Sequence, residues 1–156
     1  MPAAPELRPA TPADEAFLFA VYAATREEEL AVVAWSTAAK DAFLGMQFAA
    51  QDSYYRQHLP DATFDVVTVN GVPAGRLYVD RRDMEIRVID IALLPDHRGR
   101  GVGTALLRDI IAEGKRVTIH VERENPALRL YERLGFEVAE DKGVYLFLER
   151  QVKTAS

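Results

Sequence analysis

The stretch "DHRGRGVGTALL", residues 96–107, places glycines at positions 99, 101 and 103 directly before an apolar, helix-like run. The preceding segment, "MEIRVIDIALL" (residues 84–94), is rich in β-branched residues, so the order is strand, glycine-rich turn, helix. Unpaired N–H groups at a helix N-terminus and the helix dipole attract phosphate, and glycine lets a ligand approach the main chain closely. The stretch therefore predicts a phosphate-binding loop; the alternative is a glycine-rich turn without a ligand.

Two common nucleotide-binding motifs do not fit this loop. The dinucleotide fingerprint Gly-x-Gly-x-x-Gly stands near the start of a βαβ unit, whereas here the glycines alternate and follow what reads as an antiparallel meander. A Walker loop ends in Gly-Lys-Ser/Thr, which is missing. Both classes of nucleotide site are excluded on spacing.

Composition limits the remaining classes. With 156 residues, 49% of them hydrophobic, we expect one domain over residues 1–156. The chain has no cysteine and three histidines, so we expect no disulfide and no metal site. A net charge of −5 argues against general nucleic-acid binding. The lack of a long apolar run or a signal-like N-terminus predicts a cytoplasmic protein without membrane partners.

Outward from the loop, apolar periodicity and turn signals predict the other elements. Two helical patterns come first, one capped by Thr11 and the other from about Ser36 to His58, separated by a polar break "REEEL" (residues 26–30). The expected strands lie around Leu7 and at residues 63–69, 73–80, 84–94, 116–121, 136–139 and 144–148. Helices are expected from the loop to Gly114 and from an Asn125 cap to Gly135.

Two motifs then resemble a known family, the GCN5-related N-acetyltransferases (GNAT). "RGRGVG" matches its acetyl-CoA signature, Arg/Gln-x-x-Gly-x-Gly/Ala, through Arg98, Gly101 and Gly103, and follows a strand ending in "LLP". "NPALRLYERLGF" (residues 125–136) resembles a second signature, an asparagine followed by a tyrosine and Gly-Phe. The resemblance covers essentially the whole chain, although the helix after the loop looks shorter than usual.

The resemblance implies an α/β (α+β) fold. A mixed, mostly antiparallel sheet of six to seven strands would be splayed at the acetyl-CoA site and flanked by about four helices. The pantetheine arm would lie between the parted strands, and the loop N–H groups would hold the pyrophosphate. The alternative for Arg98 and Arg100 is a solvated surface turn. The implied cofactor site comprises Ile91, Ala92, Leu93, Arg98, Gly99, Arg100, Gly101, Val102, Gly103, Thr104, Asn125 and Tyr131.

The implied activity is acetyl transfer from acetyl-CoA to a primary amine by direct attack on the thioester. Glu85, thirteen residues before Arg98 as is the glutamate base of the histone-acetylating members, would be the base, with Asp90 as its rival and water as a third candidate. Tyr131 would be the acid, and a backbone N–H near Leu93 would hold the oxyanion. Strand alternation puts the two carboxylates on opposite faces unless a bulge intervenes. The alternatives are carboxylates paired with Arg87 or Arg76, and a tyrosine that only packs in the core.

The acceptor pocket is expected at the connection "REEELAVVAW" (residues 26–35), where an acidic and aromatic lining would suit a cationic amine. Its candidate residues are Glu27, Glu28, Glu29 and Trp35; an exposed helix end is the alternative for the glutamates. His120 is expected in the core, with a site residue as the alternative. The expected partner is a small-molecule or peptide amine, and the expected assembly is a monomer or homodimer.

Three other functions stay open at this point. A regulatory module of the same fold would bind acyl-CoA without transferring the acyl group. An acyltransferase could use a hydroxyl acceptor or a longer acyl chain. A plain interaction domain would not bind CoA.

Overall fold

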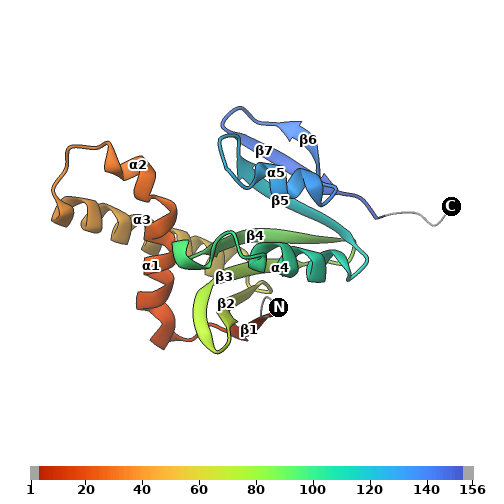
Figure 1. Ribbon diagram of the computed structural model, residues 1–156, viewed down its shortest axis with the longest axis horizontal. Helices are drawn as coiled ribbons and strands as arrows, with labels where there is room; N and C mark the ends of the chain where they lie inside the picture. Colours follow the sequence, from red (N-terminus) through yellow and green to blue (C-terminus); the bar gives the residue numbers. More distant parts are fainter. Residues whose placement is uncertain (1–3, 153–156) are drawn as a thin grey trace.

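The computed structural model describes residues 4–152, which form one seven-stranded sheet with helices on both faces (Figure 1). The strand order is β1-β2-β3-β4-β5-β7-β6. The strands are β1 (Pro5–Pro9), β2 (Thr63–Val69), β3 (Val72–Arg81), β4 (Glu85–Leu93), β5 (Arg116–Glu122), β6 (Glu137–Asp141) and β7 (Tyr145–Arg150). The helices are α1 (Glu15–Thr25), α2 (Glu27–Ala31), α3 (Thr37–His58), α4 (Val102–Ile111) and α5 (Leu128–Arg133), with 3-10 turns η1 (Pro12–Asp14) and η2 (Pro95–His97).

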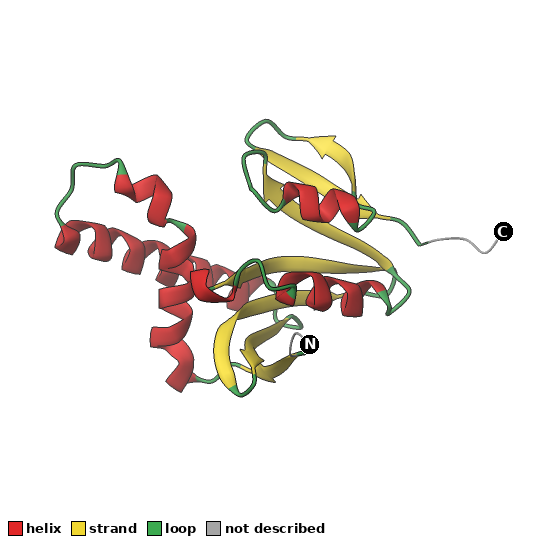
Figure 2. Cartoon of the chain, viewed as in Figure 1, coloured by secondary structure: helices red, strands yellow, loops and turns green. Residues whose placement is uncertain are grey.

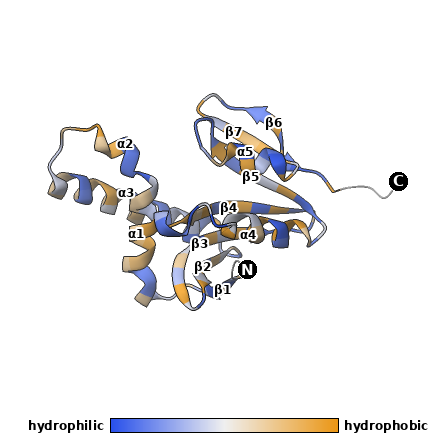
Figure 3. Cartoon of the chain, viewed as in Figure 1, coloured by the Kyte–Doolittle hydropathy of each residue, from blue (hydrophilic) through white to orange (hydrophobic). Residues whose placement is uncertain are grey.

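Two clusters of buried side chains hold the helices to the sheet. The larger one joins α4 and α5 to the sheet through residues such as Val88, Leu107 and Ile119. The smaller one lies under α1 and α3, around Tyr22 and Phe48. α1 is largely apolar along its length (Figure 3), which fits its contacts with both the sheet and α3. The two faces of the sheet are thus covered by different helix pairs (Figure 2).

The sheet parts between its two central strands. β4 and β5 pair in parallel only from Glu85–Arg116 to Val88–Ile119, whereas β5 continues beside β7 as far as Glu122. The two strands diverge in Figure 1 beyond this point. We call the unpaired stretch, residues 89–93 of β4 and 120–122 of β5, the splay. The mixed, mostly antiparallel and splayed sheet expected from the sequence is confirmed.

A β-bulge at Ile89 changes the direction of the side chains along β4. β3 pairs Val79 with Val88 but Tyr78 with Asp90, so Ile89 is an extra residue. Because paired residues share a face and Tyr78 and Val79 point to opposite faces, Asp90 lies on the face opposite Val88. Glu85 lies on that same face, since it is an odd number of residues before Val88.

Three local expectations were wrong. The "REEEL" segment is not a break, because Glu27–Ala31 forms α2, with Leu30 buried. The second-motif helix begins at Leu128 rather than just after Asn125, because the Asn125 side chain accepts the Ala127 N–H (2.8 Å) and holds a turn before the helix. His120 is exposed rather than in the core and lies against Phe147, with ring centroids 4.7 Å apart.

No helix within residues 4–152 is both long enough and apolar enough to cross a membrane.

Candidate active site

The glycine loop connects the end of β4 to α4, and its backbone conformation requires glycine at two positions. Gly99 and Gly101 have φ of +72° and +82°, in the left-handed region. A Cβ added at either position would meet no protein atom within 4 Å, so packing within the chain does not select glycine there. The Arg98 guanidinium donates from Nε to the Leu93 carbonyl (3.0 Å) and ties the loop to β4.

The start of α4 presents unpaired N–H groups. The Ala105 N–H donates to the Gly101 carbonyl (3.0 Å), which closes the first turn of the helix. The N–H groups of Val102, Gly103 and Thr104 precede this bond and have no intrahelical acceptor. Together with the positive end of the helix dipole, they form an anion-binding end directly after the left-handed glycines.

The splay exposes one edge of β4 beside this loop. Ile91, Ala92 and Leu93 pair with β3 on one side but have no β5 partner, because the parallel pairing ends at Val88. β3 approaches this part of β4 closely: a Cβ at Gly75 would lie 2.1 Å from the Ala92 carbonyl oxygen. Glycine at position 75 therefore lets β3 support the strand at the splay.

Asp90 lies in the splay beside a buried arginine. Its carboxylate forms an ion pair with Arg76 of β3, whose side chain is 3% exposed, while the Asp90 side chain is 22% exposed. Burial raises the pKa of Asp90 above its ordinary value, although Arg76 opposes this shift. A carboxylate with a raised pKa accepts a proton more readily near neutral pH than an exposed one.

Tyr131 of α5 is electrostatically coupled to Asp90. Its side chain is buried against Phe136, with ring centroids 5.8 Å apart. Burial and the negative charge of Asp90 raise the pKa of Tyr131 to about 12. Its hydroxyl is therefore protonated at neutral pH and can donate. The alternative that Tyr131 packs in the core matches its burial, and its role as an acid stays a prediction.

Glu85 lies at the opposite, paired end of β4. Thr118 of β5 donates a hydrogen bond to its carboxylate (2.6 Å), and guanidinium groups of Arg82, Arg87 and Arg116 lie at 3.5, 3.6 and 3.5 Å. Burial alone would raise the pKa of Glu85, but Thr118 and the arginines together lower it. The bulge puts Glu85 and Asp90 on one face, yet roughly 15 Å of strand separates them.

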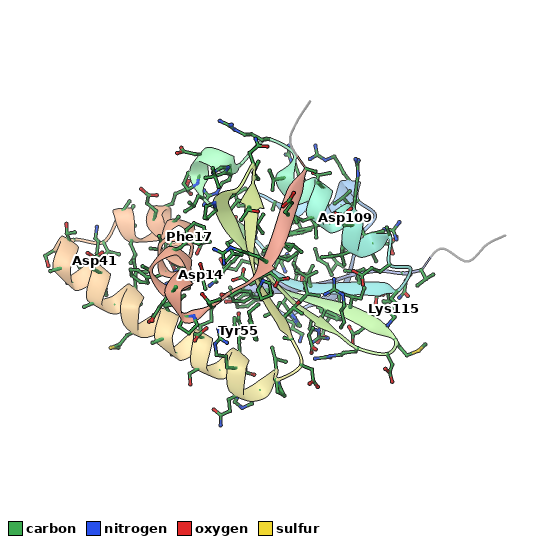
Figure 4. The ribbon with its side chains drawn as sticks, turned by 90° about the horizontal axis from the view of Figure 1, so that it is seen from below. Asp14, Phe17, Asp41, Tyr55, Asp109 and Lys115 are labelled. Atoms are coloured by element: carbon green, nitrogen blue, oxygen red, sulfur yellow. The ribbon has the colours of Figure 1, made fainter. Side chains whose placement is uncertain are left out.

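The helices contribute side chains next to Asp90 that the sequence did not single out. Gln51 and Tyr55 of α3 and Tyr22 of α1 surround Arg76 or Asp90, together with Tyr78 of β3. Tyr55 lies on the side of α3 that faces the sheet (Figure 4) and contacts the Tyr78 ring edge-on, with centroids 6.0 Å apart. Arg76 and Arg87 were the partners that the sequence offered as the alternative for the two carboxylates, and the structure pairs Arg76 with Asp90 and Arg87 with Glu85.

The residues expected to line the acceptor pocket lie on α2 and between α2 and α3, and that role stays a prediction. Glu27, Glu28 and Glu29 are exposed on α2, and Glu29 is paired with Arg26. Trp35 is 49% exposed and contacts Phe43. The groups that act on Asp90 come from β3, α3 and α5.

Among residues 4–152, no three histidine, aspartate or glutamate side chains converge as a metal site requires. The remaining expected cofactor residues, Arg100 and Asn125, lie on the exposed loop and in the turn before α5.

Comparisons with known proteins identify the family of this chain. Residues 60–138 match the model of the acetyltransferase (GNAT) domain family. The peptidyl-lysine N-acetyltransferase YjaB of Escherichia coli is 30% identical over 115 residues, which cover 72% of this chain and 76% of that protein. A mycothiol acetyltransferase of Corynebacterium aurimucosum is 43% identical over 61 residues, 35% of this chain, and the match spans 20% of that protein's length.

One solved structure shows the shared fold. The PaiA N-acetyltransferase of Thermoplasma acidophilum, solved in complex with coenzyme A, superposes with a TM-score of 0.71 at 16% sequence identity. The superposition covers 95% of this chain and 99% of that one.

Proposed function

This chain belongs to the GNAT acetyltransferase family, and from that premise we propose that it transfers an acetyl group from acetyl-CoA to a primary amine of a small molecule or peptide. The supporting observation is the end of the β4–β5 pairing at Val88 and Ile119. The splay that follows is bordered by the α4 N-terminus and contains Asp90, whose negative charge acts on Tyr131 of α5. In this proposal the anion-binding end, the carboxylate and the phenol serve one opening in the sheet.

The residues at the loop fit acetyl-CoA. The pyrophosphate would take the N–H groups of residues 99–104, and Arg98 and Arg100 would offset part of its charge. The main chain of Ile91 to Leu93 would bind the pantetheine amides along the unpaired β4 edge. The coenzyme A in the PaiA structure supports this fit. When bound, acetyl-CoA supplies an activated acetyl thioester.

Asp90 is the better placed of the two carboxylates to accept the acceptor's proton. A lysine-like amine has a pKa of about 10.4 and must lose a proton before it can attack. Asp90 lies in the splay, and burial raises its pKa, whereas Glu85 is surrounded by arginines at the paired end. Tyr131 holds a proton on its hydroxyl at neutral pH, available to the leaving group. The N–H near Leu93 remains the proposed oxyanion donor.

A lysine-like side chain is the first acceptor to test. Tyr22, Tyr55 and Tyr78 give the region beside Asp90 an aromatic character that suits an alkylamine. The name of the relative YjaB, a peptidyl-lysine N-acetyltransferase, supports the same class.

The test is a screen of amines and lysine peptides with acetyl-CoA, read by release of free thiol. We expect amine-dependent release and a higher melting temperature with acetyl-CoA, since a ligand at 100 times its Kd adds about 2.7 kcal/mol to the free energy of unfolding. CoA binding without thiol release for any amine would indicate a binding module instead. Absence of CoA binding would refute the proposal.

A pair of glycine variants locates the binding site. Gly101 and Gly114 lie at opposite ends of α4, both with left-handed φ (+82° and +84°) and open space around an added Cβ. Gly101→Glu places an anion where the pyrophosphate is expected, and we expect loss of CoA binding. Gly114→Glu has comparable backbone strain and should keep it. If both variants bind CoA with equal affinity, the loop is not the pyrophosphate site.

A further inference from the structure

Arg76 is the buried cation closest to the candidate proton acceptor, and the known features of the site give it no role. It lies in the middle of β3, between Gly75 and Leu77, and is 2% exposed. A guanidinium is rarely buried unless other groups pair with it or bind it. We propose that Arg76 is a positioning residue: it fixes the Asp90 carboxylate at the splay and sets the pH range over which Asp90 takes the acceptor's proton. This inference rests on the proposed function.

The guanidinium is held from three directions. Its Nη2 forms the ion pair with Asp90 and donates to the Gln51 side-chain oxygen of α3 (3.0 Å). Its carbon lies 4.9 Å from the centre of the Tyr78 ring and 5.8 Å from that of Tyr22. Arg76 is therefore fixed by two helices and its own strand, and Asp90 is in turn fixed by Arg76.

The ion pair and the hydrogen bond of Arg76 both use its Nη2. Its Nε is the buried side-chain nitrogen or oxygen within residues 4–152 that has no hydrogen-bond partner. Leaving a buried N–H unpaired costs about 1–3 kcal/mol. The Arg76 side chain thus leaves Nε unpaired in the conformation that points Nη2 at Asp90 and Gln51. We infer that the contacts of Nη2 outweigh the missing hydrogen bond of Nε.

Arg76 carries the positive charge that acts on Asp90, and the other neighbouring groups are uncharged near pH 7. Tyr78 faces Asp90 from β3, Tyr55 from α3 and Tyr131 from α5, and the Ile91 N–H also reaches the carboxylate. The three tyrosines are neutral near pH 7. Burial therefore favours the protonated carboxyl, and Arg76 is the group whose charge opposes burial.

The consequence for proton transfer has a definite sign. A nearby opposite charge lowers the pKa of a carboxyl by about 1–3 units. Without Arg76, the Asp90 carboxyl would stay protonated up to a higher pH. It could accept the acceptor's proton only above that pH, where it is ionised. The acidic limb of the kcat profile would move up by about 1–3 pH units, a loss of roughly tenfold per unit at a fixed pH below the limb.

The experiment compares Arg76→Met and Arg76→Lys with a matched control, Arg81→Met. Arg81 is on the same strand but pairs with Glu113, in the turn after α4 and outside the site. Two quantities are measured: the titration midpoint of the Asp90 carboxyl by carbon NMR, which needs no turnover, and the pH profile of kcat with a saturating amine. In Arg76→Met both should shift upward together, and in Arg81→Met neither should shift.

The lysine variant separates charge from orientation. Arg76→Lys keeps a cation but loses the planar fork, so the midpoint should stay near that of the parent while kcat falls. If Arg76→Met does not fold, the kcat values of Arg76→Lys and Gln51→Leu test the role of Arg76 instead. Gln51→Leu leaves the ion pair but frees the guanidinium, and it should lower kcat with little change in KM.

The two proposals fail in distinguishable ways. An unchanged Asp90 midpoint in folded Arg76→Met would overturn the role of Arg76, whatever the activity. If Arg76→Met does not fold, parental kcat in both Arg76→Lys and Gln51→Leu would overturn it as well. A shifted midpoint in a protein that transfers acetyl to no amine would instead refute the proposed function and leave the coupling of Arg76 to Asp90 standing.

Discussion

The two ends of β4 carry two carboxylates in contrasting surroundings. At the paired end, Glu85 has a hydrogen bond from Thr118 and three arginines within 3.6 Å. At the splayed end, Asp90 has one buried arginine and neighbouring tyrosines. The pKa of Glu85 is lowered and that of Asp90 is raised. The same strand thus contains one carboxylate suited to ion pairing and one suited to proton transfer.

The difference arises from the neighbouring strand rather than from β4 itself. Where β5 pairs with β4, it brings Arg116 and Thr118 to Glu85. Where β5 turns away, the carboxylate is left beside an opening, and its partners come from β3 and the helices. Parting of the sheet therefore both creates the opening proposed for the cofactor and leaves an acid there without multiple cations.

Replacing Asp90 should have the largest effect. Asp90→Asn keeps the shape but removes the base, and we expect kcat to fall by roughly 10²- to 10⁴-fold at neutral pH. The loss should shrink as the pH approaches the amine pKa, because the acceptor is then already deprotonated. The measurement is kcat with a saturating amine across pH. A loss that is equal at every pH would point to a structural role and weaken the contrast between the two ends.

Tyr131→Phe should have a smaller effect on turnover. The ring and its packing on Phe136 remain, so the melting temperature and CoA affinity should change little. Loss of the acid should reduce kcat by about 10²-fold, or less where water substitutes, since a thiolate with a pKa near 8.5 is a tolerable leaving group. Measuring kcat beside the melting temperature checks this. Full activity would assign Tyr131 to the core alone.

Glu85→Gln should have the smallest effect on turnover and act mainly on stability. The folded-state pKa of Glu85 is lowered, so its contribution is present above the unfolded pKa of about 4.3 and is lost as the pH falls through the folded value. We expect the variant to be less stable at pH 7 by about 1–2 kcal/mol, with the difference from the parent shrinking below about pH 4.

Denaturant unfolding of parent and variant at several pH values measures this difference. Thr118→Val removes the hydrogen bond from the other side and should reproduce part of the loss. A large fall in kcat for Glu85→Gln with unchanged stability would reverse the comparison and make Glu85 the base.

Local sequence patterns were sufficient for most of the fold. Glycines 99 and 101 occupy left-handed positions before α4, and Gly135 does so after α5, as their spacing after a strand and a helix indicated. Ser36 caps α3 by accepting the Ala39 N–H. These signals were readable because a turn or a cap depends on residues within a few positions of one another.

The tertiary structure alone decided the contrast within β4. The bulge at Ile89, which puts Glu85 and Asp90 on one face, depends on the register with β3, and the sequence left it open. The sequence offered Arg76 and Arg87 as partners of either carboxylate, and the fold assigns Arg76 to Asp90. It also brings the charge of Asp90 to bear on Tyr55 of α3 and Tyr131 of α5, which lie far along the chain. A pKa depends on burial and on charges nearby in space, so the residue types were visible in the sequence, whereas the role open to each carboxylate came from contacts between distant segments.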